Sequence, residues 1–316
     1  KTGTLTTGQL TLTTVLPAAP FAEPELLALA AAAETGSEHP VGRAVVAAAR
    51  ARGLDGAAVD GFRAVAGRGV EARVGGRTVR VGTAAWLRLA NVDAAPLEAD
   101  ANALAGKGET PFFVAVDGAL AGLVAVADGA APGARESVAA LRDLGLEVVM
   151  LTGDRRLTAE AVAREVGIHA VVAEVTPEGK AQEVKAQRDR GRIVAMVGDG
   201  INDAPALAAA HVGVAMGNGA DIAIAAADIA LLRGGMASLV AALRLCRRTL
   251  VVIRQNLFWA FVYNVVGIPI AAGLLYPWTG WLLSPVLASA TMSLSSVSVL
   301  LNSLRLRSFP GGARGG

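Results

Sequence analysis

The chain has 316 residues, of which 53% are hydrophobic, and its 29 basic and 27 acidic residues leave a formal net charge of +2. That length is enough for two ordinary domains, and so small a positive excess does not favour a nucleic-acid surface. The single cysteine, Cys246, excludes an internal disulfide framework and is typical of a reducing compartment.

The chain starts with KTGTLTTG, a turn-like stretch of small residues. It carries neither an initiator methionine nor a signal-peptide pattern. We therefore expect the sequence to be a fragment that begins inside a longer protein.

Residues 17–118 have the pattern of an inserted α+β domain. An alanine-rich stretch predicts a helix over residues 24–33, and a second helix is predicted to begin after His39 and Pro40. Short apolar runs bounded by glycine predict strands over residues 69–74, 77–82 and 111–118. Because these elements interrupt the pattern of the flanking sequence, the domain around them is predicted to be discontinuous.

The flanking sequence alternates apolar strands with helices. Strands are predicted over residues 146–151, 193–197 and 212–216, and helices over residues 157–166 and 179–190. Such alternation predicts a parallel, doubly wound α/β sheet, in which ligands bind outside the carboxyl ends of the strands. Residues 1–16 and 119–240 are assigned to this domain. Each of these strands ends in a polar, glycine-containing turn, so we expect the turns to form one site.

Two acidic residues mark that site. Asp199 and Asp203 lie close together in the stretch MVGDGINDAPAL. Such carboxylates repel each other unless a cation lies between them or one is neutralised, and oxygen ligands beside a phosphate are suited to Mg²⁺. Thr152 and Gly153 can bind phosphate oxygens, and Lys180 can bring a positive charge to the same edge. Taken singly, such residues are also common as turn residues, helix N-caps or surface side chains.

The last part of the chain has the pattern of a membrane hairpin. Residues 256–275 and 282–304 contain no charged side chain, and each is long enough to cross a hydrocarbon core of about 30 Å as a helix. Arginines precede the first segment and follow the second, which places both ends in the cytoplasm by the positive-inside rule. The alternative is a buried helical hairpin in a soluble protein. Residues 250–305 are assigned to two transmembrane helices and residues 306–316 to a flexible tail.

Polar residues inside these two segments need an explanation, because hydrocarbon disfavours them. They are Tyr263, Asn264, Met292, Ser295 and Ser296. Contacts between helices are the first explanation. The second is a path for a soft metal ion, because no Asp, Glu, His or Lys follows Asp228 and a thioether is suited to Cu(I).

Over residues 1–307 the motifs resemble those of the heavy-metal subfamily of P-type ATPases, and within it the copper(I) pumps. KTGT, TGD at 152–154 and GDGIND at 198–203 are similar to the motifs of its haloacid-dehalogenase-type phosphorylation domain. SEHP at 37–40 and GRG at 67–69 are similar to motifs of its nucleotide-binding domain. Tyr263-Asn264 and Met292-x-x-Ser295-Ser296 are similar to the membrane signatures of the copper(I) pumps.

The resemblance implies a role for each matching residue. In the family's first motif, D-K-T-G-T, the aspartate is phosphorylated by ATP, so the nucleophile is expected before Lys1, with Lys1 and Thr4 beside it. Mg²⁺ is expected between that aspartate, Asp199 and the backbone carbonyl of Thr2. The surroundings of the phosphoryl group are assigned to Thr152, Gly153, Asp154, Lys180, Asn202 and Asp203. In the nucleotide-binding domain, His39 is expected at the adenine, and the other contacts are expected from Glu34, Gly67, Gly69 and Gly82.

The same resemblance implies an activity and a place in the cell. ATP-driven export of Cu(I), or of Ag(I), would proceed through an aspartyl phosphate, with Mg²⁺ as cofactor and a copper chaperone as the source of the ion. Tyr263, Asn264, Met292 and Ser296 would carry the ion. The pump would lie in the lipid bilayer of a bacterial plasma membrane, with its soluble domains in the cytoplasm. Because the nucleophile and the earlier membrane helices are expected in a missing N-terminal part, the fragment alone is expected to be inactive.

Three stretches depart from the family pattern, and two alternatives stay open. Thr83 follows Gly82 in place of Asn, ADGAA at 127–131 replaces D-P-x-K/R, and GNGAD at 217–221 replaces G-T-G-T-D. The alternatives are a soluble phosphatase of the same superfamily and an inactive nucleotide-binding remnant. A zinc or cadmium exporter would need charged residues in the last helices, and none is present there.

Overall fold

The computed structural model describes residues 1–54, 57–65, 67–198, 203–217, 225–233, 235–280 and 284–308. The chain separates into two compact units, residues 1–236 and 237–316, and each is described by itself.

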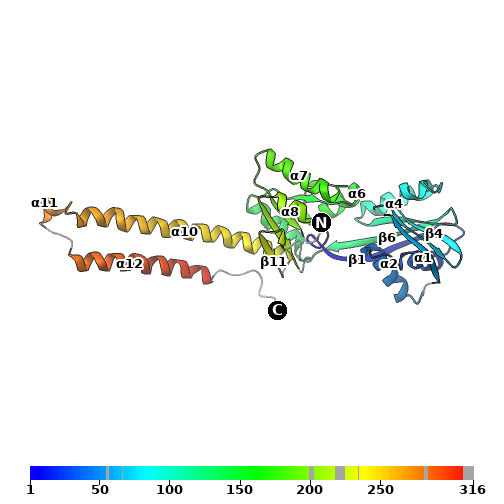
Figure 1. The fold of residues 1–316 in the computed structure, drawn as a ribbon, viewed down its shortest axis with the longest axis horizontal. Coiled ribbons are helices and arrows are strands. Elements are labelled where there is room, and N and C mark those ends of the chain that lie inside the picture. Colours follow the sequence, from blue (N-terminus) through cyan, green and yellow to red (C-terminus); the bar gives the residue numbers. More distant parts are fainter. Residues whose placement is uncertain are drawn as a thin grey trace. The chain divides into compact units, whose positions relative to one another are not determined.

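A six-stranded antiparallel sheet dominates one part of the first unit (Figure 1). In spatial order its strands are β1 (Thr6–Pro17), β6 (Ala119–Ala130), β5 (Thr110–Val116), β4 (Arg77–Gly82), β3 (Gly69–Val74) and β2 (Val59–Val65). Alternation along the strands creates its two faces, because successive side chains of a strand point to opposite sides. In β5, for example, Val114 and Val116 belong to one apolar cluster, whereas Phe113 and Ala115 belong to another.

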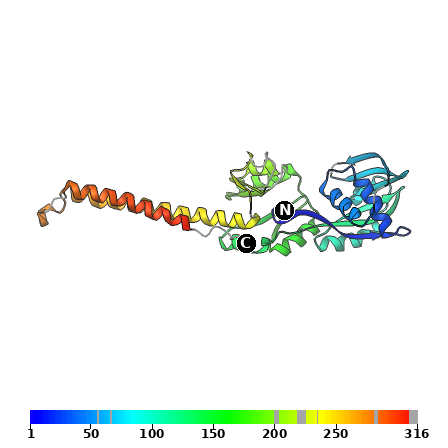
Figure 2. The same cartoon turned by 90° about the horizontal axis from the view of Figure 1, so that it is seen from below.

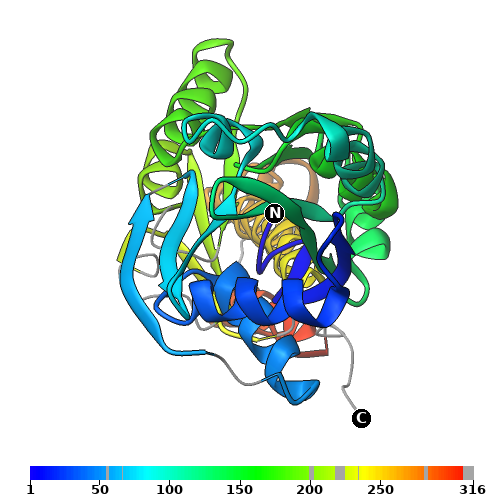
Figure 3. The same ribbon diagram turned by 90° about the vertical axis from the view of Figure 1, so that its right-hand side faces the viewer.

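Helices cover both faces of this sheet. The helices α1 (Glu23–Glu34) and α2 (Pro40–Ala51) pack over the face that carries Val114, and α1 lies beside α2 (Figure 3). The short helix α3 (Ala84–Arg88) and α4 (Glu98–Gly106) supply side chains to the cluster on the other face. Leu26 and Leu27 of α1 are completely buried, so this helix is held by apolar contact with the sheet.

The strands predicted over 69–74 and 77–82 form as β3 and β4 with the same bounds, and the one predicted over 111–118 forms as β5. The two longest strands were not predicted. β1 and β6, of 12 residues each, pair with each other along the two stretches of chain that lead into and out of the inserted segment. The exact domain boundaries assigned from the sequence remain a prediction.

The rest of the first unit contains parallel strands. They are β7 (Val149–Leu151) paired with β8 (Ala170–Val172), and β10 (Val212–Met216) between β9 (Ala195–Gly198) and β11 (Ile229–Leu231). The helices of this part are α5 (Ala134–Asp143), α6 (Arg156–Val166), α7 (Pro177–Asp189) and α8 (Ala204–Ala209).

The parallel strands correct the sequence-based expectation of one continuous sheet. Among the described residues they form a two-stranded and a three-stranded sheet with no ladder between the two. The helix α6 connects β7 to its partner β8, and α8 connects β9 to its partner β10, whereas α7 connects strands that do not pair. The alternation of strand and helix was therefore predicted correctly, but the pairing across α7 was not.

In the last part of the chain, α10 (Gly235–Ala271) and α12 (Pro285–Leu304) run antiparallel beside each other (Figures 1 and 2). The short α11 (Tyr276–Thr279) follows α10, and a 3₁₀ turn, η3 (Arg305–Ser308), follows α12. The amide of Asn256 donates to Ser303 at 2.9 Å, and the amide of Asn302 donates to Asn256 at 2.8 Å, so polar contacts join the helices.

These two helices lie where the two membrane segments were predicted. In the described part of the chain, however, no helix combines the length and the apolar character needed to cross a membrane. The polar run Arg254–Asn256 lies inside α10 and interrupts its apolar residues. The prediction of two crossing helices is therefore not confirmed. In the predicted flexible tail, residues up to Ser308 form η3, and residues 309–316 lie outside the described part.

Candidate functional site

The first candidate loop is KTGT, at the end of strand β7. Gly3 has a φ of +68°, and the backbone N–H of Leu5 donates to the carbonyl of Lys1 at 2.9 Å, which closes a tight turn. The backbone nitrogen of Lys1 lies 3.5 Å from the carbonyl oxygen of Leu151, the last residue of β7. The ammonium of Lys1 lies 2.5 Å from a carboxylate oxygen of Asp154, and its side chain is only 6% exposed. KTGT and TGD therefore meet, as the sequence predicted for the strand ends.

The TGD loop also contacts the segment that leads into α7. The side-chain oxygen of Thr152, which is buried, accepts a hydrogen bond from the backbone N–H of Asp154 at 3.1 Å. The backbone N–H of Val175 donates to the carbonyl of Thr152 at 3.1 Å. A Cβ on Gly153 would lie 3.4 Å from the carbonyl oxygen of Val175, so little space remains there for a side chain.

The start of α7 places Lys180 beside Asp203. Thr176 caps the helix by accepting from the N–H of Gly179 at 3.1 Å. The ammonium of Lys180 lies 2.7 Å from Asp203, and the two side chains are 16% and 13% exposed. A Cβ on Gly198 would lie 2.7 Å from a carboxylate oxygen of Asp203, so only glycine leaves room for the carboxylate.

The structure thus connects most of the predicted phosphoryl-site residues in one series of contacts. Lys1 meets Asp154, the TGD loop meets the segment before α7, and Lys180 meets Asp203. Thr4 is buried and Thr2 is exposed. Asp199 and Asn202 lie outside the described residues.

The magnesium ligands remain a prediction. Among the described side chains, no three from His, Cys, Asp and Glu form a group suited to a metal ion. Of the predicted set, Asp203 and the carbonyl of Thr2 are described, and both offer oxygen, the donor that Mg²⁺ prefers. The donor chemistry of the residues present therefore fits the ion.

Sequence analysis noted Asp128 only as part of a departed motif and missed its contacts. Asp128 is 6% exposed, and its carboxylate accepts from the hydroxyls of Thr6 at 2.5 Å and Thr7 at 3.0 Å and from the N–H of Gly8 at 3.0 Å. These donors immediately follow KTGT in the chain, so Asp128 fixes the start of β1. The conserved-looking cue was the aspartate itself, but its partners were unremarkable threonines.

Glu34 and His39 flank the turn between α1 and α2. Burial raises the pKa of Glu34 above its usual value of 4.5, and a hydrogen bond from Ser37 offsets part of this. His39 caps α2, because its Nδ1 accepts from the N–H of Val41 at 3.3 Å. Burial, and in second place the charge of Arg43, lower the pKa of His39 below its usual 6.5. At neutral pH His39 is therefore the neutral imidazole, which the cap requires.

The predicted nucleotide-contacting glycines have different surroundings. Gly67 has a φ of +70° and open space where a side chain would be. Gly69 pairs with Gly82 across β3 and β4, and a Cβ on Gly69 would lie 2.1 Å from the carbonyl oxygen of Val81. At least part of the reason for glycine at 69 is therefore the close approach of protein backbone.

Trp86 was missed by sequence analysis and lies against this glycine pair. Its ring carbon Cδ1 would be 3.0 Å from a Cβ on Gly69 and 2.8 Å from a Cβ on Gly82. The indole N–H is buried and makes no hydrogen bond in the described structure. The guanidinium of Arg80 lies 5.6 Å from the centre of the ring. A single tryptophan in an aliphatic segment was the only cue in the sequence.

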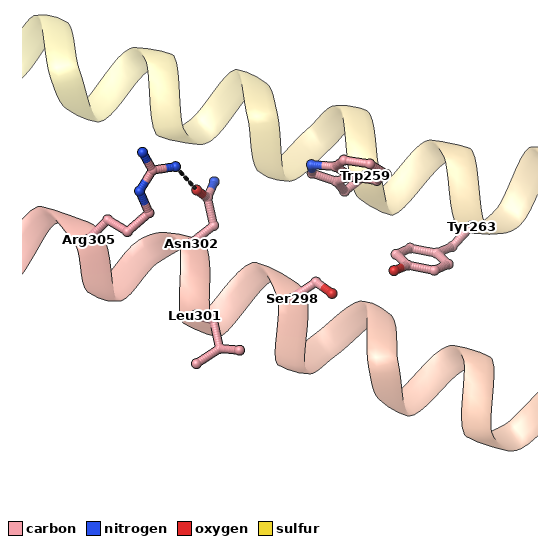
Figure 4. Close-up of a pocket in the computed structure, with 6 residues that line it drawn as sticks. All are labelled: Trp259, Tyr263, Ser298, Leu301, Asn302 and Arg305. Carbon is pink, nitrogen blue, oxygen red and sulfur yellow. Dashed lines mark hydrogen bonds between the residues drawn. The ribbon is translucent and has the colours of Figure 1, made fainter.

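The predicted copper ligands lie on α10 and α12. Tyr263 lines a cavity between the two helices, and the amide of Asn264 donates to the carbonyl of Ala260 at 2.8 Å (Figure 4). Ser296 is exposed, and the side chain of Met292 lies outside the described part. Their assignment to a metal ion remains a prediction.

Comparison with known proteins gives consistent matches. Residues 1–211 match the family model of haloacid dehalogenase-like hydrolases. The chain is 50% identical over 308 residues to copper-transporting ATPase 2 of Rhizobium meliloti (strain 1021), a match that covers 98% of this chain and 37% of that relative. It is 50% identical over 307 residues to a copper-exporting P-type ATPase of Legionella pneumophila, with 97% of this chain and 42% of that relative covered.

Among solved structures, the fold is similar to that of a zinc-transporting PIB-type ATPase in its E2.Pi state. The TM-score is 0.74 at 36% identity, over 97% of this chain and 48% of that chain. The matches confirm the expected haloacid-dehalogenase-like phosphorylation domain with an inserted nucleotide-binding domain. The chain spans 37% to 42% of the length of the two relatives described above.

Proposed function

The chain belongs to the haloacid dehalogenase-like hydrolase family, and we propose that it is the C-terminal part of a P-type ATPase that exports Cu(I). ATP would phosphorylate an aspartate that precedes Lys1 in the longer protein, and hydrolysis of the aspartyl phosphate would drive transport. The observation that carries the proposal is the series of contacts from Lys1 through the TGD loop to Lys180 and Asp203.

The proposed phosphoryl site works mainly by charge. Transfer of a phosphoryl group requires positioning and electrostatic stabilisation more than covalent chemistry. Lys180 would neutralise the group from the start of α7, and Thr152 and Gly153 would donate hydrogen bonds from the TGD loop. Asp203 holds the ammonium of Lys180 at 2.7 Å and so orients it. Mg²⁺, held by Asp199, Asp203 and the carbonyl of Thr2, would supply further neutralisation of the phosphate charge.

The nucleotide would bind at the turn between α1 and α2. Because Nδ1 of His39 accepts from Val41, the proton of the neutral ring lies on Nε2 and can be donated to a purine nitrogen. Phe62 connects this turn to strand β2, since a Cβ on Gly36 would lie 2.9 Å from its ring. Strand β2 leads directly to the loop of Gly67 and Gly69, which supports a shared site with His39.

The proposed ion is Cu(I), or Ag(I), because the last part of the chain offers sulfur and neutral oxygen but no charged ligand. No Asp, Glu, His or Lys follows Asp228. Tyr263, Asn264, Met292 and Ser296 would carry the ion, and a thioether is a ligand for soft metals. Identity supports copper over zinc: the described relatives named for copper are 50% identical to the chain, against 36% for the structure named for zinc.

We place the pump in a bacterial plasma membrane, with residues 1–236 in the cytoplasm and a copper chaperone as donor of the ion. Large apolar side chains on α10 support this placement, because Phe258, Phe261 and Val265 are 60%, 66% and 67% exposed. Lipid and the remaining part of the pump would cover them.

Nucleotide binding tests the assignment of His39. In the 316-residue chain, His39→Gln is expected to weaken ATP binding by about tenfold or more, as loss of a hydrogen bond in a polar site does. Isothermal titration measures it, and His169→Gln, at an exposed histidine, is the control. Unchanged affinity in the His39 variant would refute the role of His39.

The metal assignment is tested in the longer protein that contains the aspartate before Lys1. Its ATPase activity is expected to rise with Cu(I) or Ag(I) and not with Zn²⁺. Stimulation by Zn²⁺ alone would overturn the choice of metal. Metal-independent hydrolysis of a small phosphomonoester, in a protein that stays in the soluble fraction, would favour the phosphatase.

A further inference from the structure

A cavity of about 380 Å³ lies between α10 and α12 (Figure 4). It is lined by Trp259 and Tyr263 from α10 and by Ser298, Leu301, Asn302 and Arg305 from α12 and η3. The proposed copper path uses only Tyr263 of these, so the cavity needs an explanation of its own.

A polar network fixes Arg305 at one end of the cavity. Its guanidinium donates to the side-chain oxygen of Asn302 at 3.2 Å, as the dashed line in Figure 4 marks. The amide nitrogen of Asn302 in turn donates to Asn256 at 2.8 Å and to Gln255 at 3.3 Å. Asn302 is therefore oriented by α10, and its oxygen faces the arginine. A guanidinium has several N–H donors, and the described contacts use one of them here.

The charge of the cavity is positive and uncompensated. Because no Asp or Glu follows Asp228, this part of the chain supplies no carboxylate for Arg305. An arginine fork whose partners are neutral amides is suited to an oxyanion, and above all to phosphate.

The aromatic side chains narrow the choice of anion. The rings of Trp259 and Tyr263 lie 6.4 Å apart on the same side of α10, and in Figure 4 the indole nitrogen is directed toward Asn302. Such rings, with an apolar body and a polar edge, prefer the boundary between lipid and water. A phosphate that is attached to an apolar molecule would match both the arginine and the rings.

We propose that this cavity binds a phosphate group, in the form of the phosphodiester headgroup of an anionic phospholipid. Arg305 binds the phosphate oxygens, Asn302 orients Arg305, and Trp259 and Tyr263 flank the glycerol end of the lipid. The lipid as source of the phosphate rests on the membrane placement proposed above. Free phosphate shares the same chemistry, so the test separates the two sources.

The test compares two arginines of η3. Arg305 lines the cavity, whereas Arg307 is exposed and does not. The full chain is titrated with phosphatidylcholine vesicles that contain or lack phosphatidylglycerol, and binding is measured by co-sedimentation. The wild-type chain is expected to prefer the anionic vesicles. Arg305→Gln is expected to reduce that preference by about tenfold, the effect of losing a charged hydrogen bond, while Arg307→Gln keeps it.

A second arm uses inorganic phosphate without vesicles and follows tryptophan fluorescence. A response that depends on Arg305 and not on Arg307 supports the phosphate site with a soluble source. Equal losses in both variants would mean diffuse attraction to arginines and would overturn the proposal, as would the absence of any Arg305-dependent effect in both arms. A chain that binds no vesicle of either kind contradicts the membrane placement, and the phosphate arm then still decides on the cavity.

Discussion

The six-stranded sheet and the strand ends of the parallel part stabilise their polar residues in different ways. At the strand ends each described carboxylate has a close donor: Lys1 for Asp154, Lys180 for Asp203, and two hydroxyls and an N–H for Asp128. In the sheet region, Glu34 is buried without an ion pair among the described residues, and the glycines face backbone and an indole ring. The first region should therefore respond to changes of charge and the second to changes of volume.

The largest effect is expected from added volume at Gly69. Gly69→Ala places a Cβ 2.1 Å from the carbonyl oxygen of Val81, and Gly69 has a φ of +152°. Backbone cannot yield as a flexible side chain can, so the free energy of unfolding should fall by more than about 3 kcal/mol. Urea denaturation of the full chain measures it.

Gly67→Ala is the matched control in the same loop. Gly67 also has a positive φ but no atom within 4 Å of the added carbon, so only backbone strain of about 1 kcal/mol is expected. Equal losses at both positions would show that strain, and not packing against β4, determines the need for glycine in this loop.

The volume-limited region was the easier one to predict from the sequence. The strands β3 and β4 were predicted to the residue because valines alternate with polar residues between glycines. Trp86 could not be predicted as their neighbour, because contact across the sheet depends on where α3 lies. The long strands β1 and β6 were missed because their pairing joins residues more than a hundred positions apart.

A slightly smaller effect is expected from removing a charge at the strand ends. Lys180→Met leaves Asp203 without its ammonium partner at a side-chain exposure of 13%. Breaking one member of such a pair should reduce the free energy of unfolding by about 3 kcal/mol. Lys185→Met, at an exposed position of the same helix, should change it by less than about 0.5 kcal/mol. Similar values for both variants would contradict the view that this region depends on paired charge.

Asp128 tests whether hydrogen bonds without a cation have the same importance. Asp128→Ala leaves two hydroxyls and one N–H without their acceptor in a buried place, which should cost about 2 kcal/mol of unfolding free energy. Asp128→Asn keeps one side-chain oxygen and should recover about half of the loss. No recovery by asparagine would mean that the negative charge itself is required.

The strand-end site could be predicted as a set of motifs but not as a set of contacts. The carboxyl ends of parallel strands were expected to converge, and Lys180 with Asp203 and Lys1 with Asp154 do meet. The split of the parallel strands into two sheets was not foreseen, because strand alternation does not specify which strands pair. Asp199 and Asn202 remain predictions because they lie outside the described residues.

The smallest effect is expected from Glu34, and it appears only as a dependence on pH. Burial raises the pKa of Glu34 above 4.5, so the folded chain retains the proton at pH values where the unfolded chain has lost it. The contribution to stability is complete below pH 4.5 and is lost as the pH rises through the pKa of the folded state. His39 acts in the opposite direction: its lowered pKa makes its contribution complete above pH 6.5 and lost as the pH falls through the folded-state pKa.

Glu34→Gln removes only the first of these two dependences. The unfolding free energy of the variant, relative to the wild type, is therefore expected to rise between pH 4.5 and neutral pH, as followed by urea denaturation at each pH. Glu38→Gln, at an exposed neighbour, is the control and should give no such slope. A flat difference for Glu34→Gln would mean that this buried carboxylate is compensated as fully as Asp203 is by Lys180. In that case the two regions would not differ in how they accommodate charge, and only the packing at Gly69 would still separate them.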